Sequence, residues 1–269
     1  MTTSGAQRIE RAIRDGARGG REAALVAFIT AGFPSREAFG DVLRAAGSAA
    51  DAVEIGVPFT DPMADGVTIQ RSSRVALEQG TNLAWILEAA AGLEPKPAAP
   101  LVLMSYLNPL LSFGFEQLAE RAAEAGVSGV IVPDLPLEES RPLAEATAAR
   151  GLALVSLVTP VTPPARRRTL AEASRGFLYA VTSTGTTGGR ALGVDPAMTD
   201  YLAGLREVSP VPVCAGFGVR SAEHVAALAP HVDGIIVGSA LVEAIERGDD
   251  PAEYLRELRA GAHAKEETP

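Results

Sequence analysis

The sequence has few of the residues on which several common kinds of catalysis depend. Its 269 residues include two lysines, one cysteine and three histidines. Lys96 lies in a proline-rich stretch and Lys265 near the C-terminus, so neither is expected at the end of a buried strand. Schiff-base chemistry is therefore disfavoured. No histidine stands at metal-ligand spacing from a cysteine or carboxylate, which disfavours a zinc or iron site. Nucleotide-binding and serine-hydrolase motifs are also missing.

Other absences bear on where the chain works and what it meets. A single cysteine, Cys214, cannot form an intramolecular disulfide, which is typical of a reducing compartment. The N-terminal segment lacks the apolar core of a secretory signal, and no apolar run is long enough to cross a bilayer. A net charge of −9 repels phosphate backbones. We therefore expect a cytoplasmic globular protein with no nucleic-acid or membrane partner.

What is present is a series of short apolar runs, separated by stretches with helical spacing. The runs are continuous rather than alternating, which indicates parallel strands covered on both faces. They lie at 25–30, 52–56, 101–106, 128–132, 152–158, 177–182, 212–216 and 233–238. Eight strands, each followed by a helix, predict an α/β fold, a (β/α)8 TIM barrel. A doubly wound open sheet is the alternative, although the dinucleotide loop of many such sheets is missing.

No linker or change of composition divides the chain, so we expect a single domain over residues 1–269. An extra helix is predicted at 6–18, before the first strand. The tails at 1–5 and 262–269 are predicted to be disordered.

Glu54 interrupts the apolar run at 52–56, where a buried strand should carry only apolar side chains. Side chains alternate along a strand, so if Val53 and Ile55 face the helices, Glu54 faces the barrel interior near the C-terminal strand ends. Burial there would raise its pKa toward neutrality, which suits a general acid or base. The alternative is a structural glutamate paired with an arginine. Asp65, in the next loop, would hold an N–H group or a positive charge on a substrate, or form a turn before Gly66.

Small residues follow the last three predicted strands, at 184–189, 215–221 and 237–240. In barrels of this kind, backbone N–H groups of these loops and a helix N-terminus commonly bind a phosphate. Aromatic residues at strand ends would wall a flat apolar ligand or simply pack in the core; they are Phe28, Tyr106, Tyr179 and Phe217. The residues alone thus predict a phosphorylated substrate and carboxylate acid–base chemistry.

The segment "VEIGVPFTDPMADGVTIQ" closely resembles the signature of the tryptophan synthase alpha subunit family. Further segments agree with that family in order and spacing: "AFITAGFPS", "SYLNPLLSFG", "VIVPDLPLEES", "GTTGGR", "GFGVRSAEHV" and "VGSALV". The resemblance implies a barrel that cleaves indole-3-glycerol phosphate into indole and glyceraldehyde 3-phosphate in L-tryptophan biosynthesis. It implies a retro-aldol reaction with no cofactor and no metal, and a PLP-dependent beta subunit as partner in an alpha2beta2 heterotetramer.

The resemblance also implies roles for individual residues. Glu54 matches the general acid/base, Asp65 the carboxylate that holds the indole N–H, and Tyr179 a tyrosine beside the catalytic glutamate. The implied substrate-binding residues are Phe28, Tyr106, Thr187, Gly188, Phe217, Gly218, Gly238 and Ser239.

Two loops, 57–67 and 183–195, are implied to close the site and meet the partner. The chain departs from the family pattern in or beside these loops, at Val67, Thr182 and Thr186. Three other functions stay open at this point. The first is a free-standing lyase that releases indole. The second is a scaffold that binds and regulates a beta subunit, and the third is another phosphate-binding barrel, such as a sugar-phosphate isomerase.

Overall fold

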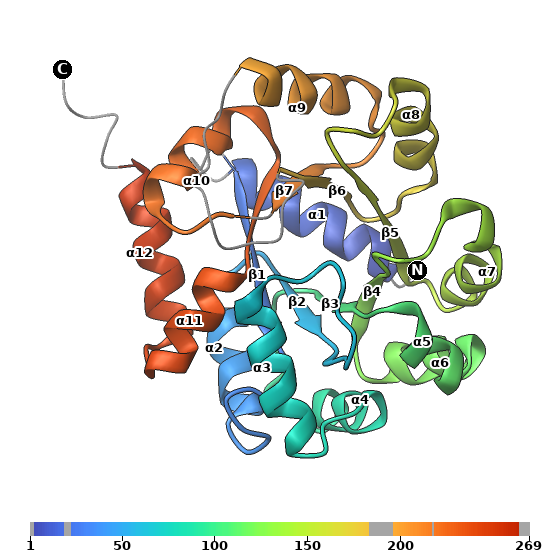
Figure 1. Ribbon diagram of the computed structural model, residues 1–269, viewed down its shortest axis with the longest axis vertical. Coiled ribbons are helices and arrows are strands. Elements are labelled where there is room, and N and C mark those ends of the chain that lie inside the picture. Colours follow the sequence, from blue (N-terminus) through green and yellow to red (C-terminus); the bar gives the residue numbers. More distant parts are fainter. Residues whose placement is uncertain (1–2, 19–22, 183–195, 217, 264–269) are drawn as a thin grey trace.

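The computed structural model describes residues 3–18, 23–182, 196–216 and 218–263. Eight parallel strands pair in chain order, and β8 pairs with β1, which closes the sheet into a barrel. Figure 1 shows the strands at the centre with helices around them. The strands are β1 (Ala24–Thr30), β2 (Ala52–Gly56), β3 (Leu101–Met104), β4 (Val127–Ile131), β5 (Ala153–Val158), β6 (Leu178–Val181), β7 (Val213–Gly216) and β8 (Gly234–Val237). The predicted (β/α)8 barrel is confirmed, and the alternative of an open sheet is wrong.

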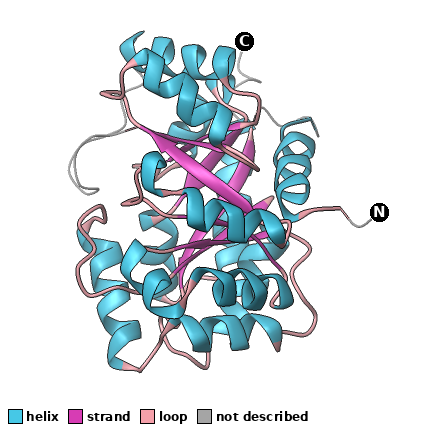
Figure 2. Ribbon diagram, turned by 90° about the vertical axis from the view of Figure 1, so that its right-hand side faces the viewer, coloured by secondary structure: helices cyan, strands magenta, loops and turns pink. Residues whose placement is uncertain are grey.

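Helices surround the barrel (Figure 2). They are α1 (Gly5–Arg18), α2 (Phe39–Ala49), α3 (Val67–Glu78), α4 (Leu83–Ala91), α5 (Leu107–Phe113), α6 (Phe115–Glu124), α7 (Arg141–Ala149), α8 (Pro164–Ala173), α9 (Pro196–Val208), α10 (Ala222–Leu228), α11 (Ser239–Arg247) and α12 (Pro251–His263), with short 3-10 helices at Leu137–Glu139 and Ala229–His231. The extra N-terminal helix is confirmed. Helices α1 and α12 extend into the stretches predicted as tails, at Gly5 and through His263. Within the described parts of the chain, no helix is long and apolar enough to span a membrane.

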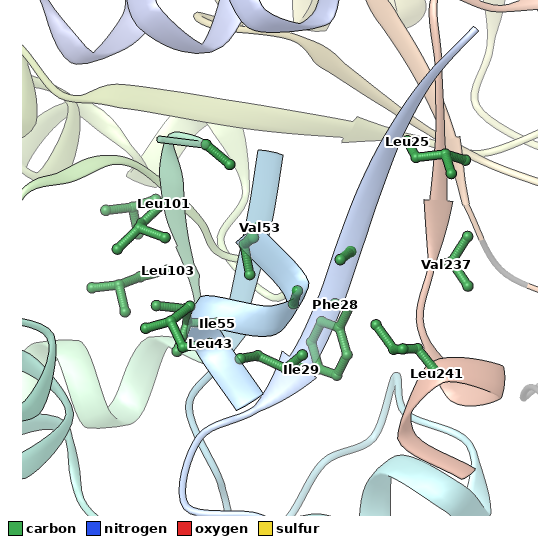
Figure 3. Packing of buried hydrophobic residues seen from close by; sticks show 14 of the residues in the cluster. Leu25, Phe28, Ile29, Leu43, Val53, Ile55, Leu101, Leu103, Val237 and Leu241 are labelled. Atoms are coloured by element: carbon green, nitrogen blue, oxygen red, sulfur yellow. The ribbon is translucent and has the colours of Figure 1, made fainter. Parts of the chain in front are cut away.

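The core has two layers because each strand buries both faces. The outer layer lies between strands and helices, where Figure 3 shows Val53 and Ile55 of β2 with Leu43 of α2. The inner layer fills the barrel and includes Ile9 and Ile13 of α1, both fully buried. These two residues pack against the first residues of several strands, so α1 closes the N-terminal end of the barrel. The opposite end is left to the loops that follow the strands.

Asp51 connects the N-terminal end of the barrel to the last helix. Its Oδ2 accepts hydrogen bonds from the Leu25 backbone N–H at 2.8 Å and from Arg259 at 2.6 Å, and 15% of its side chain is exposed. Asp51→Ala removes this shielded acceptor, so we expect the free energy of unfolding to fall by about 2–3 kcal/mol. Urea unfolding measures this change.

The control for that measurement is Glu10→Ala, which removes an exposed ion pair with Arg14 within α1. An exposed pair of this kind contributes little, so the control is expected to change the free energy of unfolding by less than about 0.5 kcal/mol. A loss in Asp51→Ala no larger than in this control would show that Asp51 does not stabilise the barrel end.

Candidate active site

Glu54 lies inside the barrel, as its position in the sequence predicts. Its neighbours Val53 and Ile55 belong to the outer layer, whereas Ala52, on the same face of β2 as Glu54, belongs to the inner layer. The side chain is completely buried. Neither carboxylate oxygen has a hydrogen-bond partner among the residues that the structure describes. The alternative of a structural glutamate paired with an arginine is therefore wrong.

Burial without a partner has a direct chemical consequence for Glu54. Desolvation disfavours the charged carboxylate and raises the pKa of Glu54 to about 8. At neutral pH the side chain is mostly protonated, so it can donate a proton and take one back.

Tyr179, on β6, is buried beside this carboxyl group. Burial raises the pKa of Tyr179 well above its ordinary value, and the charges of Glu54, Cys214 and Asp65 act in the same direction. A Cβ atom added at Gly216 would lie 2.4 Å from the Tyr179 hydroxyl oxygen, so only glycine fits opposite the ring. The structure thus brings Tyr179 and Glu54 together, as predicted.

Asp65 and Tyr106 form a second polar pair, closer to the surface. The Tyr106 hydroxyl accepts a hydrogen bond from the Ala64 backbone N–H at 2.9 Å and is hydrogen-bonded to the Asp65 carboxylate. Partial burial raises the pKa of Asp65 to about 6, although the Tyr106 hydrogen bond acts to lower it. Asp65 is therefore mostly ionised at neutral pH, the opposite state to Glu54. Two carboxyl groups with separated pKa values are typical of a site with one acid and one charge-stabilising group.

A small apolar cleft lies above Glu54 at the barrel mouth. Its lining includes Phe28, Asp65, Tyr106 and Gly56, which is two residues beyond Glu54 on the same face of β2. A Cβ atom at Gly56 would lie 2.4 Å from the Phe28 ring, so the ring covers this end of the strand. The cleft measures about 20 Å³, room for one water molecule.

Phe59 is a residue of this cleft region that the sequence analysis missed. Its ring stacks on Tyr106 with centroids 5.1 Å apart and an angle of 27° between the rings. The position of Phe59 in the sequence marks it as a candidate, because it is the first aromatic residue after β2 in the long loop that carries Asp65. The contact itself was not readable from the sequence, because Tyr106 follows a different strand.

Three of the predicted substrate-binding residues, Gly218, Gly238 and Ser239, follow β7 and β8 and so lie at the same end of the barrel. Gly238 and Ser239 form the start of α11, and no side chain of the described residues caps this N-terminus. A helix N-terminus without a side-chain cap can bind an anion through its backbone N–H groups. Gly218, after β7, has a positive φ of 89°, which favours glycine. Thr187, Gly188 and Phe217 lie outside the described residues.

The three departures from the family pattern fall in different environments. Val67, the first residue of α3, is 66% exposed. Thr182 is buried, and its hydroxyl donates a hydrogen bond to the Gly216 carbonyl at 2.7 Å, which ties the end of β6 to the end of β7. Thr186 lies outside the described residues.

Comparison with known proteins identifies the family. The model of a family described as tryptophan synthase alpha chain matches residues 16–268. The chain belongs to this family. It is 43% identical to the tryptophan synthase alpha chain of Nitratidesulfovibrio vulgaris (strain DP4) over 93% of this chain and 97% of that one. It is 41% identical to the alpha chain of Deinococcus radiodurans over 97% and 96%.

Solved structures agree with this membership of the alpha chain family. A structure of Mycobacterium tuberculosis tryptophan synthase superposes with a TM-score of 0.87 at 35% identity, covering 97% of this chain and 99% of that one. A mutant tryptophan synthase alpha subunit from Pyrococcus furiosus gives 0.79 at 32% identity, covering 90% and 98%. The chain is accordingly a lyase that acts on indole-3-glycerol phosphate, and the resemblance seen in the sequence is confirmed.

Proposed function

We propose that Glu54 and Asp65 divide the work of the lyase reaction between them. Protonated Glu54 donates its proton to C3 of the indole, and the ionised Asp65 holds the N–H as positive charge develops on the ring. The hydroxyl on the adjoining glycerol carbon then loses its proton to a base, for which Glu54 is again available. The carbon–carbon bond breaks, its electrons return to the ring, and indole and glyceraldehyde 3-phosphate result.

The observation that carries this proposal is the state of the Glu54 carboxyl group. It is fully buried, without a hydrogen-bond partner among the described residues, and its pKa is raised to about 8. Such a group is costly to keep in a barrel core and contributes nothing to holding the strands together. A dry proton donor buried two residues before Gly56, which lines the cleft at the barrel mouth, is what cleavage of an indole substrate requires.

Phe28 and Tyr106 are proposed as the walls for the indole ring, with Tyr179 beside Glu54. The cleft of about 20 Å³ is too small for an indole, so we propose that the 57–66 segment moves and that Phe59 leaves the face of Tyr106. Gly218, Gly238 and Ser239 are proposed to bind the phosphate through backbone N–H groups and the Ser239 hydroxyl. From the sequence alone, Thr187 and Gly188 are proposed as further substrate-binding residues, and Phe217 as a further aromatic wall.

A beta subunit is proposed to dock over the barrel mouth and form an alpha2beta2 heterotetramer. Among the described residues, four large apolar side chains are unusually exposed: Met63 at 83%, Val67 at 66%, Leu111 at 54% and Val161 at 77%. All four follow the C-terminal ends of β2, β3 or β5. Exposed apolar residues gathered on one face are typical of a protein interface. The reducing compartment predicted from the single cysteine makes the cytoplasm our proposed location.

The experiment that tests the proposed function is indole release from indole-3-glycerol phosphate by the full chain, alone and with a tryptophan synthase beta subunit. We expect slow release that rises by orders of magnitude with the partner. Fast release that the partner does not change would favour a free-standing lyase. Strong activation of the beta subunit with no indole release in either case would favour a regulatory scaffold.

Val161→Asp tests the proposed docking face. A carboxylate in the interface would be desolvated without a partner, so we expect the concentration of beta subunit needed for half-maximal activation to rise at least about tenfold. Indole release by the chain alone is expected to stay within about twofold of wild type. The matched control is Arg11→Asp on α1, at the opposite end of the barrel. Equal effects of the two substitutions would place the interface elsewhere.

A further inference from the structure

One carboxylate joins three segments at the barrel mouth. Glu243, on α11, accepts a hydrogen bond from the Thr68 hydroxyl to Oε1 at 2.8 Å, and the Arg220 guanidinium donates to Oε2. Thr68 is in the first turn of α3, and Arg220 is in the segment after β7. Helices α11 and α3 lie side by side in Figure 1. Both oxygens of one side chain are therefore used to hold other parts of the barrel mouth.

We propose that Glu243 is a positioning residue for Asp65: it holds the first turn of α3, and with it Asp65, in a fixed place relative to the phosphate-binding end of α11. The inference rests on the proposed function, because it takes Asp65 as the group that holds the indole N–H and the start of α11 as the place of the phosphate. Glu243 does not touch the substrate in this proposal and acts through Asp65.

The connection between Thr68 and Asp65 is short. Asp65 stands three residues before Thr68, and its backbone carbonyl accepts a hydrogen bond from the side chain of Gln70 at 2.9 Å, also on α3. The N-cap of α3 is Gly66, which supplies no side-chain cap. The Thr68 hydroxyl, on a side chain that is 7% exposed, reaches across to α11 instead. A shift of this first turn would therefore move Asp65.

The connection to the phosphate end is equally short. Glu243 stands one helical turn after Ser239, and Arg220 stands two residues after Gly218. An unpaired carboxylate so close to a bound phosphate would repel it. The Arg220 guanidinium pairs with Glu243 and cancels that charge. Glu243 and Arg220 thus each lie close in sequence to one of the two segments proposed to bind the phosphate.

The Glu243 carboxylate is held in its charged form. Burial acts to raise its pKa, but the hydrogen bonds from Thr68 and Arg220, with the charges of Arg220 and Arg71, outweigh it and leave the pKa below its ordinary value. Both oxygens therefore stay acceptors at neutral pH, so Thr68 keeps its partner under working conditions.

The same pair of helices offers a matched control. Arg71 of α3 donates to Glu246 of α11, one turn further from the barrel mouth, at 2.8 Å. These side chains are 48% and 39% exposed, and an exposed ion pair contributes little. Glu246→Gln therefore removes one carboxylate between the same helices without disturbing the first turn of α3.

The test measures kcat and KM for indole-3-glycerol phosphate cleavage by full-length variants. Glu243→Gln and Thr68→Val are each expected to lower kcat about tenfold with less than a threefold change in KM, because a small displacement of Asp65 weakens its hold on the developing charge. Thr68→Ser keeps the hydroxyl and is expected to retain kcat within about twofold. Glu246→Gln is expected to do the same. Equal losses in Glu243→Gln and Glu246→Gln would overturn the proposal.

A double mutant shows whether Glu243 acts through Asp65. In an Asp65→Asn background, Glu243→Gln is expected to change kcat less than about twofold, because the group that it positions is already lost. A further tenfold loss in that background would overturn the inference and leave the proposed function standing. An unchanged kcat in Asp65→Asn alone would overturn the proposed role of Asp65, and this inference with it.

Discussion

Glu54→Gln is expected to lower kcat for indole release at least about a thousandfold while KM stays within about tenfold. Glutamine keeps the shape of the side chain and removes the proton that the reaction needs, and general acid–base groups commonly contribute factors of this size. The measurement is steady-state indole release with the beta subunit present, so that the wild-type rate is at its highest.

The control for this prediction is Glu246→Gln, an equivalent change on an exposed face of α11, which is expected to keep kcat within about twofold. Circular dichroism and thermal unfolding show whether each variant folds. A folded Glu54→Gln variant that keeps more than about a tenth of the wild-type kcat would contradict the role assigned to Glu54.

The same substitution is expected to stabilise the fold, most strongly at alkaline pH. The folded protein holds the Glu54 proton up to about pH 8, whereas the unfolded chain releases it near the ordinary value of 4.5. Between these values the folded state binds more protons, so the contribution of Glu54 to the free energy of unfolding falls by about 1.4 kcal/mol for each pH unit as the pH rises. Above pH 8 the carboxylate is charged in both the folded and the unfolded state, and the stability that the bound proton contributes at lower pH is lost.

Glutamine at position 54 has no proton to lose, so the variant lacks this decline. We expect its free energy of unfolding to exceed that of wild type by roughly 3–5 kcal/mol at pH 8 and by much less at pH 5. Urea unfolding of both proteins at the two pH values measures the difference. Glu10→Gln, on the surface of α1, controls for the loss of one carboxyl group. A wild-type advantage at pH 8 would mean that Glu54 stabilises the barrel rather than serving catalysis.

Local pattern was sufficient for the barrel and for the orientation of Glu54. Continuous apolar runs mark strands that are buried on both faces, and the alternation of side chains along β2 places Glu54 with Ala52 inside the barrel. Helix boundaries are harder to predict: the stretch "SREAFGDVLRAAGSA" has helical spacing from Ser35 onward, but its helix begins only at Phe39. The Ser35 hydroxyl accepts the Ala38 N–H in a turn before that helix. A serine can cap a helix or close a turn, and the sequence does not distinguish these two uses.

Contacts across the barrel mouth could not be predicted from the sequence. Tyr106 hydrogen-bonds Asp65 from a different strand end, and the Thr68 to Glu243 bond joins residues 175 positions apart. Such pairs depend on how α3 and α11 pack against each other, and no periodicity along the chain encodes that. The positions of Glu54 and Asp65 in the sequence made them candidates for acid and charge-stabilising groups, and the resemblance to the alpha chain family supplied the reaction in which they act. The structure added the physical reason for them, which is the contrast in burial between Glu54 and Asp65.

The most direct test of this account is the pH dependence of kcat/KM for indole-3-glycerol phosphate cleavage, which reports the pKa values of the free enzyme. We expect a bell-shaped profile. Activity falls below about pH 6, where Asp65 gains a proton, and above about pH 8, where Glu54 loses the proton that it must donate. Because the substrate phosphate also titrates near pH 6, Asp65→Asn serves as the control and is expected to remove most of the acid limb. Activity that stays constant or rises between pH 8 and roughly pH 9.5 would show that a protonated Glu54 is not the acid in this reaction.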